Sequence, residues 1–150
     1  MVLLLGSNAY SPFRLDALKA ALAKADPTLG PVAIDAKWVY ALELVDAPVD
    51  SQELARAAEL LNAEGSCDGA DFYVTPRKGT ISPWSSKATD IFRNCGLKSI
   101  RRVERGIRFF VSEAGPYAPR AALDARDEDG RRPGAVALPP AALAALYDKM

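Results

Sequence analysis

Two long stretches of the sequence alternate between hydrophobic and polar residues with a period of two, which is the spacing of a β-strand with one buried face. The first runs from Val32 to Leu44 and the second from Ser99 to Ser112. This pattern predicts that Lys37, Glu43 and Arg108 point to solvent. The residues that share the hydrophobic faces are Val32, Ile34, Ala36, Trp38, Tyr40, Leu42 and Leu44 in the first strand, and Val103, Ile107, Phe109 and Val111 in the second.

Three other stretches carry hydrophobic residues at helical spacing, and each has its own start signal. Serine followed by proline opens two of them, at 11–12 and 82–83, because serine caps free N–H groups and proline fits the first helical position. Asp50 with Glu53 predicts a capping box before the third. The predicted helices are 12–25, 51–62 and 83–95, and shorter hydrophobic runs predict strands at 1–5 and 72–75.

Strands and helices alternate along residues 1–112, which favours an α+β domain with a mixed or antiparallel sheet and helices packed on one face. The two long strands and the two serine–proline helix starts indicate two successive units of similar build. Residues 113–150 are rich in proline, glycine and charge, which is typical of a linker. A further helix is expected at 141–149, and its unpartnered apolar stripe predicts that these 150 residues are a truncated part of a longer chain.

Composition limits the chemistry that the chain can perform. Nineteen basic and nineteen acidic residues cancel, which argues against a dedicated nucleic-acid or membrane-surface protein. Histidine is absent, so the usual general base, histidine-containing triads and the commonest zinc sites are excluded. Cys67 and Cys95 are too few for a disulfide framework, and no secretion signal is present, so a cytoplasmic setting is expected. We predict no catalytic residue, no metal site and no membrane span.

The most unusual stretch is the start of the third predicted helix, where hydroxyl side chains and a lysine gather within residues 80–90. Free N–H groups and the helix dipole favour anions there, so a phosphate or a carboxylate could bind. In the structural alternative, Ser82 caps the helix and Trp84 packs against the core. Ser85 and Ser86 then satisfy the remaining backbone donors.

A run of six basic side chains follows, with Glu104 as its single acidic residue. Such a run could contact RNA or a phosphorylated ligand. Strand alternation divides it between two faces without interleaved aromatic residues, which favours a solvated or ion-paired surface instead. Trp38 and Tyr40 lie in an alternating stripe and are interpreted as core. The basic residues are Arg93, Lys98, Arg101, Arg102, Arg105 and Arg108.

Three segments carry a resemblance to one family: Arg77–Ile91, which contains Thr-Ile-Ser-Pro-Trp-Ser-Ser-Lys-Ala-Thr-Asp, then Asn94–Leu97 and Arg102–Ile107. With the opening Gly6-Ser7, they make the chain from Val2 to Val111 similar to the N-terminal region of the large, single-chain phosphoribosylformylglycinamidine synthase of purine biosynthesis. The resemblance implies that residues 1–112 form two tandem units like the small PurS subunit, arranged as a pseudo-dimer.

The same resemblance implies part of an ATP-dependent ligase, an amidotransferase that uses glutamine-derived ammonia to convert formylglycinamide ribonucleotide to the amidine. In this family the glutaminase triad and the ATP and Mg²⁺ sites belong to later domains, so this region binds no cofactor and scaffolds the synthase and glutaminase domains. The alternatives are a stand-alone phosphate- or RNA-binding module and an independent small enzyme. Residues expected at the interdomain junction, on the ammonia path or against phosphate are Thr80, Ser82, Trp84, Ser85, Ser86, Lys87, Asp90 and Arg105.

Overall fold

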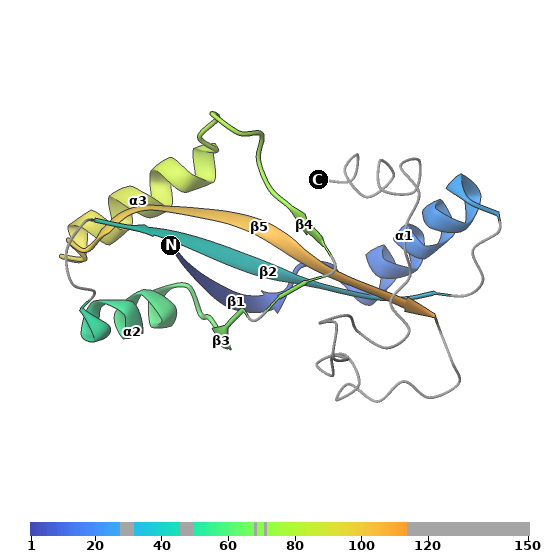
Figure 1. Cartoon of the computed structure of the whole chain (residues 1–150), viewed down its shortest axis with the longest axis horizontal. Helices are drawn as coiled ribbons and strands as arrows, with labels where there is room; N and C mark the ends of the chain where they lie inside the picture. Colours follow the sequence, from blue (N-terminus) through green and yellow to red (C-terminus); the bar gives the residue numbers. More distant parts are fainter. Residues whose placement is uncertain (28–31, 46–49, 68, 71, 114–150) are drawn as a thin grey trace. The chain divides into compact units, whose positions relative to one another are not determined.

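The computed structural model describes residues 1–27, 32–45, 50–67, 69–70 and 72–113. Within these residues the chain forms three helices and a five-strand antiparallel sheet with the strand order β3-β1-β2-β5-β4 (Figure 1). The predicted α+β class is therefore confirmed. The elements are β1 (Val2–Asn8), α1 (Pro12–Ala25), β2 (Val32–Leu44), α2 (Ser51–Leu60), β3 (Gly65–Ser66), β4 (Phe72–Val74), α3 (Pro83–Asn94) and β5 (Ile100–Glu113).

The predicted elements of the described residues are confirmed, with differences of one to three residues at their ends. β1 extends to Asn8, beyond its predicted end at Leu5, and α2 stops two residues early. The two-residue strand β3 was not predicted, because so short a segment has no alternation to read. It exists through its antiparallel pairing with β1. The predicted linker and the helix at 141–149 lie outside the described residues.

All three helices begin at the predicted capping residue. The side chains of Ser11, Asp50 and Ser82 each accept a hydrogen bond from a backbone N–H of the first turn. The predicted capping box is wrong, however. The Glu53 carboxylate accepts a hydrogen bond from the Ser99 N–H at 2.7 Å, which ties α2 to the segment that enters β5. Hydrogen bonds from Ser99 also lower the pKa of Glu53.

The chain forms two compact units, and neither is one continuous stretch. Unit 1 contains residues 1–9, 37–69 and 73–108, and unit 2 contains the intervening residues together with those from 109 onward. β2 and β5 each contribute residues to both units. The predicted arrangement of two tandem units stays a prediction.

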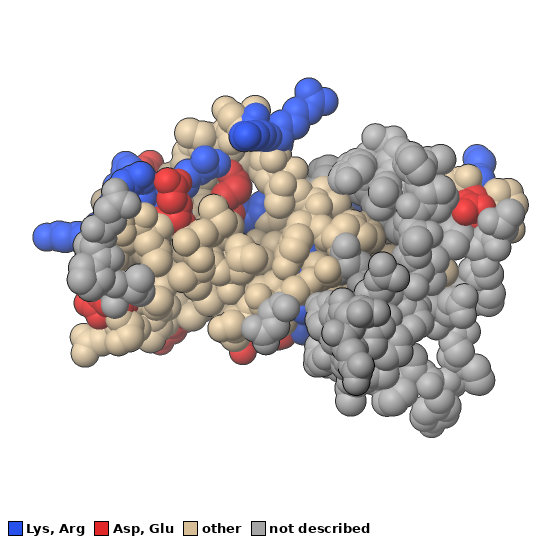
Figure 2. Space-filling model, viewed as in Figure 1, with Lys and Arg blue, Asp and Glu red and all other residues tan. Residues whose placement is uncertain are grey.

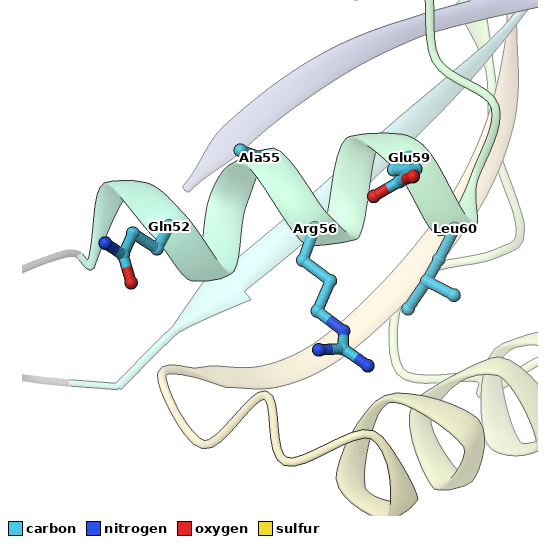
Figure 3. Close-up of a pocket in the computed structure, with 5 residues that line it drawn as sticks. All are labelled: Gln52, Ala55, Arg56, Glu59 and Leu60. Atoms are coloured by element: carbon cyan, nitrogen blue, oxygen red, sulfur yellow. The ribbon is translucent and has the colours of Figure 1, made fainter.

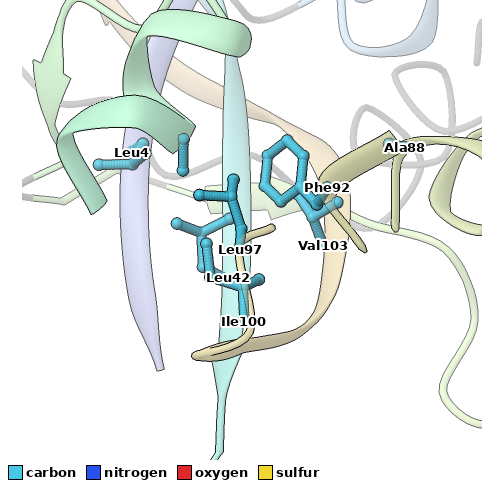
Figure 4. Close-up of a cluster of buried hydrophobic side chains, with 8 residues drawn as sticks. Leu4, Leu42, Ala88, Phe92, Leu97, Ile100 and Val103 are labelled. Carbon is cyan, nitrogen blue, oxygen red and sulfur yellow. The ribbon is translucent and has the colours of Figure 1, made fainter. Parts of the chain in front are cut away.

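A hydrophobic cluster in unit 1 joins α2 and α3 to the sheet (Figure 4). Leu42 and Val103, on β2 and β5, are completely buried, and Phe92 of α3 packs against them. Both helices of this unit therefore lie on one face of the sheet, as predicted. The cluster comprises Leu4, Leu42, Ala57, Ala88, Phe92, Leu97, Ile100 and Val103.

Aromatic rings form the centre of unit 2. The ring of Phe109 lies 5.1 Å from that of Phe72 and 6.2 Å from that of Tyr10, measured between centroids. Leu18 and Leu22 are the buried residues of α1. This unit thus buries the hydrophobic stripe that the sequence predicted for its helix.

Two basic residues that were predicted to face solvent are buried. Lys37 is 5% exposed and Arg108 is 7% exposed, while Val39 beside Lys37 is 3% exposed. The Lys37 ammonium lies 2.6 Å from the Glu64 carboxylate, so its stem can be buried while its charge is neutralised. The alternating pattern predicts the wrong exposure for Lys37, because a lysine can be buried when its charge is paired with a carboxylate.

Candidate functional site

Two of the three hydroxyl side chains of α3, those of Ser85 and Thr89, bind the neighbouring strand. Ser85 is completely buried and donates a hydrogen bond from Oγ to the carbonyl oxygen of Val103 at 2.6 Å. Thr89 Oγ1, one turn further on, accepts from the N–H of the same Val103 at 3.2 Å. The helix side chains therefore satisfy both backbone groups of one β5 residue, as a neighbouring strand would do.

A second set of bonds closes around the start of α3. Ser82 Oγ accepts from the Ser85 N–H and donates to the Glu104 carboxylate at 2.7 Å. Arg102 donates to Glu104 at 2.9 Å and to Ser85 Oγ at 3.2 Å. It also donates to the carbonyl oxygen of Thr80 at 3.2 Å. These side chains form a ring of hydrogen bonds that fixes the helix start on β5.

Glu104 is the acceptor at the centre of this ring. Burial alone would raise its pKa, but the hydrogen bonds from Ser82, from the Arg105 N–H and from Arg102 outweigh burial, so the pKa is lowered. A carboxylate with a lowered pKa stabilises the fold while it is ionised. That contribution is complete above the ordinary carboxyl pKa of 4.5 and is lost as the pH falls through the lowered value.

Glu104→Gln should therefore lower the free energy of unfolding by about 1–3 kcal/mol at pH 7. The difference between the variant and the parent chain should shrink as the pH falls from 4.5 through the lowered pKa of Glu104, because the unfolded chain takes up the proton before the folded parent does. Urea denaturation at pH 7 and at pH 3 measures both values. Glu43→Gln is the control, because its side chain is 45% exposed. A difference that stays constant between the two pH values would contradict the role of Glu104.

Beside this network, three aromatic rings and one guanidinium form a half-buried cluster, which we call the Arg105 cluster: Trp38, Tyr40, Trp84 and Arg105. The guanidinium carbon of Arg105 lies 4.5 Å from the centroid of the Trp38 ring and 4.9 Å from that of Trp84. The rings of Tyr40 and Trp84 stack with centroids 5.8 Å apart. These contacts are typical cation–π and aromatic packing geometry.

Gly6 of β1 leaves room for this cluster. A Cβ atom at Gly6 would lie 2.7 Å from the Tyr40 ring and 3.1 Å from Cβ of Trp38. Any larger residue would push these rings away from their present places. Burial raises the pKa of Tyr40, and the Arg105 charge opposes that rise. The cluster therefore depends on residues from β1, β2, α3 and β5.

A groove of about 290 Å³ runs along α3 and contains three of the predicted basic residues. Arg101 lies 3.5 Å from Glu43, and Arg93 lies 3.7 Å from Asp90. Figure 2 shows blue basic and red acidic side chains side by side over α3. The prediction of an ion-paired surface is therefore confirmed for these arginines. The groove is lined by Glu43, Ile81, Ser85, Ser86, Thr89, Asp90, Arg93, Arg101 and Arg102.

The structure separates the predicted site residues into three groups. Ser82 and Ser85 are engaged in the network, and Thr80 Oγ1 donates to the carbonyl oxygen of Arg77 within a local turn. Trp84 and Arg105 belong to the Arg105 cluster. The exposed members are Ser86, Lys87 and Asp90.

The contacts of Arg105 with the rings of Trp38 and Trp84 were not predicted. Trp38 and Tyr40 were interpreted as core, and no aromatic residues were found next to the arginines along the strand. The rings come from β2 and α3, which the sheet and the helix bring to β5. Only the pairing of β2 with β5 could have revealed this arrangement, since sequence spacing carries no signal for it.

A second hollow, of about 560 Å³, lies on α2 (Figure 3). Gln52, Arg56 and Leu60 point to the same side of the helix, and Ala55 and Glu59 complete the lining. One arginine and one glutamate from a single helix do not make an acid–base pair with a substrate position between them. We assign no role to this hollow.

Metal and redox chemistry find no support in the described ranges. These residues contain no group of three histidine, cysteine, aspartate or glutamate side chains that could hold a metal ion. Cys67 and Cys95 are both free and half-buried. The Sγ atom of Cys67 lies 3.7 Å from the Tyr73 hydroxyl. None of the helices in the described part of the chain is long and apolar enough to cross a membrane.

The fold and the site define an α+β domain in which helix hydroxyls bind one strand and a cationic aromatic cluster lies half-exposed beside them. The family described as formylglycinamide ribonucleotide amidotransferase N-terminal matches residues 37–150. This match covers most of the chain, and the chain belongs to that family. The family resemblance found in the sequence is thereby confirmed.

Proposed function

We propose that this chain is a docking domain of an ATP-dependent glutamine amidotransferase that makes formylglycinamidine ribonucleotide in purine biosynthesis. The family match over residues 37–150 is the observation that carries the proposal. In this proposal the synthase and glutaminase activities belong to other domains of the same enzyme. The domain keeps those two parts in a fixed relative position and binds neither ATP nor Mg²⁺ itself. We place this enzyme in the cytoplasm.

The chemistry of the described residues supports a docking role. The hydroxyl side chains of Ser82, Ser85 and Thr89 hold α3 against β5. Ammonia passing between two active sites must stay unprotonated and must not escape to solvent, so a domain that seals the junction contributes as much as either site. A rigid helix start is well suited to such a junction.

We also propose that the domain consists of two tandem units that resemble a dimer of the PurS subunit. The structural basis is the pair of long strands, β2 and β5, which lie next to each other in the sheet. A two-unit domain would present two related surfaces, one for each catalytic part.

Lys87 offers a test of the junction, because it is exposed on α3 within the family motif. In the complete amidotransferase, Lys87→Ala should lower the glutamine-dependent rate by about threefold or more, and the ammonia-dependent rate by less than about twofold. The two rates are measured with saturating formylglycinamide ribonucleotide and ATP, and with glutamine or ammonium chloride as the nitrogen source. The control is Lys24→Ala, which removes an exposed lysine from the last turn of α1.

Equal loss of both rates would contradict a role in ammonia transfer, because the synthase reaction itself would then depend on Lys87. Salt-sensitive binding of RNA by the 150-residue chain would support the rival interpretation as a free-standing binding module. The docking proposal expects no such binding, since the groove arginines are matched by Glu43 and Asp90.

A further inference from the structure

Arg105 carries a charge that the described residues do not neutralise. Its guanidinium carbon lies over the Trp38 ring, 4.5 Å from the centroid, and over the Trp84 ring, 4.9 Å from the centroid. Among the residues that the structure describes, no carboxylate or carbonyl oxygen accepts a hydrogen bond from this side chain. A guanidinium carries its five N–H donors in its own plane, and contact with an aromatic ring does not give these donors an oxygen acceptor. This geometry leaves the edge of the group available to an acceptor.

The nearest carboxylate in the sequence is already engaged. Glu104 accepts from Ser82, from Arg102 and from the backbone N–H of Arg105, but not from the Arg105 side chain. The carboxylate next to Arg105 in the sequence therefore binds Ser82 and Arg102 and does not pair with the Arg105 guanidinium. The cation–π contacts hold the guanidinium against the two indole rings, but they supply no hydrogen-bond acceptor for its N–H groups.

We propose that the edge of the Arg105 guanidinium binds one oxyanion group, a carboxylate or a phosphate, with the two indole rings holding the guanidinium in position. A planar fork that is already oriented loses little entropy when it binds such a group in a bidentate manner. The proposal needs only this chain and does not depend on the docking role.

The oxyanion has two possible sources with the same chemistry. It is either the carboxylate of an acidic side chain on a partner domain or the phosphate of a small phosphorylated ligand. Arginine and tryptophan are also the residues that most often dominate the energy of protein interfaces, which favours the carboxylate of a partner. Glutarate and inorganic phosphate are simple probes that separate the two sources.

The chain supplies its own reporter for this site. Trp38 and Trp84 are the only tryptophans in the sequence, and both contact Arg105. Tryptophan fluorescence of the 150-residue chain therefore observes the cluster alone. We expect a saturable change in emission when glutarate or phosphate is added at constant ionic strength. A lower half-saturation concentration for glutarate indicates the carboxylate source, and a lower value for phosphate indicates the phosphate source.

Arg105→Met should raise the half-saturation concentration at least about tenfold, because methionine keeps the packing and removes the charge. Arg105→Lys should weaken binding as well, since an ammonium lacks the planar fork. Arg101→Gln is the matched control, because it removes one positive charge from the groove outside the cluster. Urea denaturation of each variant, followed by circular dichroism, verifies that it is folded.

Three results would overturn the proposal. One is the absence of a saturable response to either anion in the parent chain. The second is an unchanged half-saturation concentration in Arg105→Met. The third is an equal loss of binding in Arg101→Gln, because the response would then come from general surface charge. A folded Arg105→Met variant that no longer responds, beside an Arg101→Gln variant that does, supports the site.

Discussion

Ser85→Ala should lower the free energy of unfolding by about 1–3 kcal/mol, whereas Ser86→Ala should change it by less than about 0.5 kcal/mol. The two serines are neighbours on α3, and residue type alone does not distinguish them. In the structure Ser85 is completely buried and bonds to Val103 and Arg102, while Ser86 is exposed. Removing the Ser85 hydroxyl takes the donor from the buried Val103 carbonyl oxygen and removes one of the acceptors of Arg102, which keeps its bonds to Glu104 and to Thr80.

The Ser86 variant is a control for helix propensity, because both substitutions replace serine with alanine in the same helix. The double variant Ser85→Ala/Thr89→Val deprives both backbone groups of Val103 of their partners and should cost about 2–5 kcal/mol. Urea denaturation of the four chains gives the values. Equal effects of the two single variants would show that the hydroxyls of α3 do not hold the helix on β5.

These hydroxyls also explain why the motif looked like a ligand site. A helix start rich in serine and threonine favours anions, and it equally favours bonds to a strand that has no neighbour at that point. Only the position of β5 beside α3 decides between the two. The predicted capping role of Ser82 is confirmed. Ser85 was expected to satisfy a backbone donor of the helix, but that expectation is wrong, because its hydroxyl donates to the carbonyl oxygen of Val103 on β5.

The fold was more predictable than the site, for physical reasons that particular residues illustrate. Periodicity and caps are local, so Ser11 and Ser82 mark their helices correctly and the two long strands are found at their observed places. Burial of a charge depends on a distant partner. Lys37 is buried because Glu64, 27 positions later in the sequence, neutralises it. The Arg105 cluster depends in the same way on contacts between separate elements.

Polar and hydrophobic contacts together fix the position of α3 in unit 1. Unit 1 combines a hydrophobic cluster with a polar network that is satisfied within the described residues: Ser82, Ser85, Thr89, Arg102 and Glu104 bond to one another or to β5. A satisfied network of this kind fixes orientation, because each bond has a preferred direction. It would hold the exposed residues of α3 in a fixed position toward a partner domain. Hydrophobic packing alone constrains such positions less strictly.

The ion pair between Lys37 and Glu64 is the second contact whose loss should strongly lower the free energy of unfolding. Glu64→Ala should lower the free energy of unfolding by about 2–3 kcal/mol, because it leaves the Lys37 charge buried without its partner. The cost should be smaller than the roughly 3–5 kcal/mol of a fully buried pair, since the Glu64 side chain is 51% exposed. Lys37→Met should cost less than about 1 kcal/mol, because methionine fills the same buried space without a charge.

The double variant decides whether the ion pair causes this difference. Glu64 takes part in a further interaction, so its removal has a cost of its own. In the background of Lys37→Met, Glu64→Ala should cost only that remainder, and the pairwise coupling should be about 1–2 kcal/mol. Urea denaturation of the parent, the two single variants and the double variant at pH 7 provides the cycle. A coupling near zero would contradict the burial of the Lys37 charge. A solvated ammonium loses little free energy when its partner is removed, so that result would mean that the Lys37 ammonium reaches solvent.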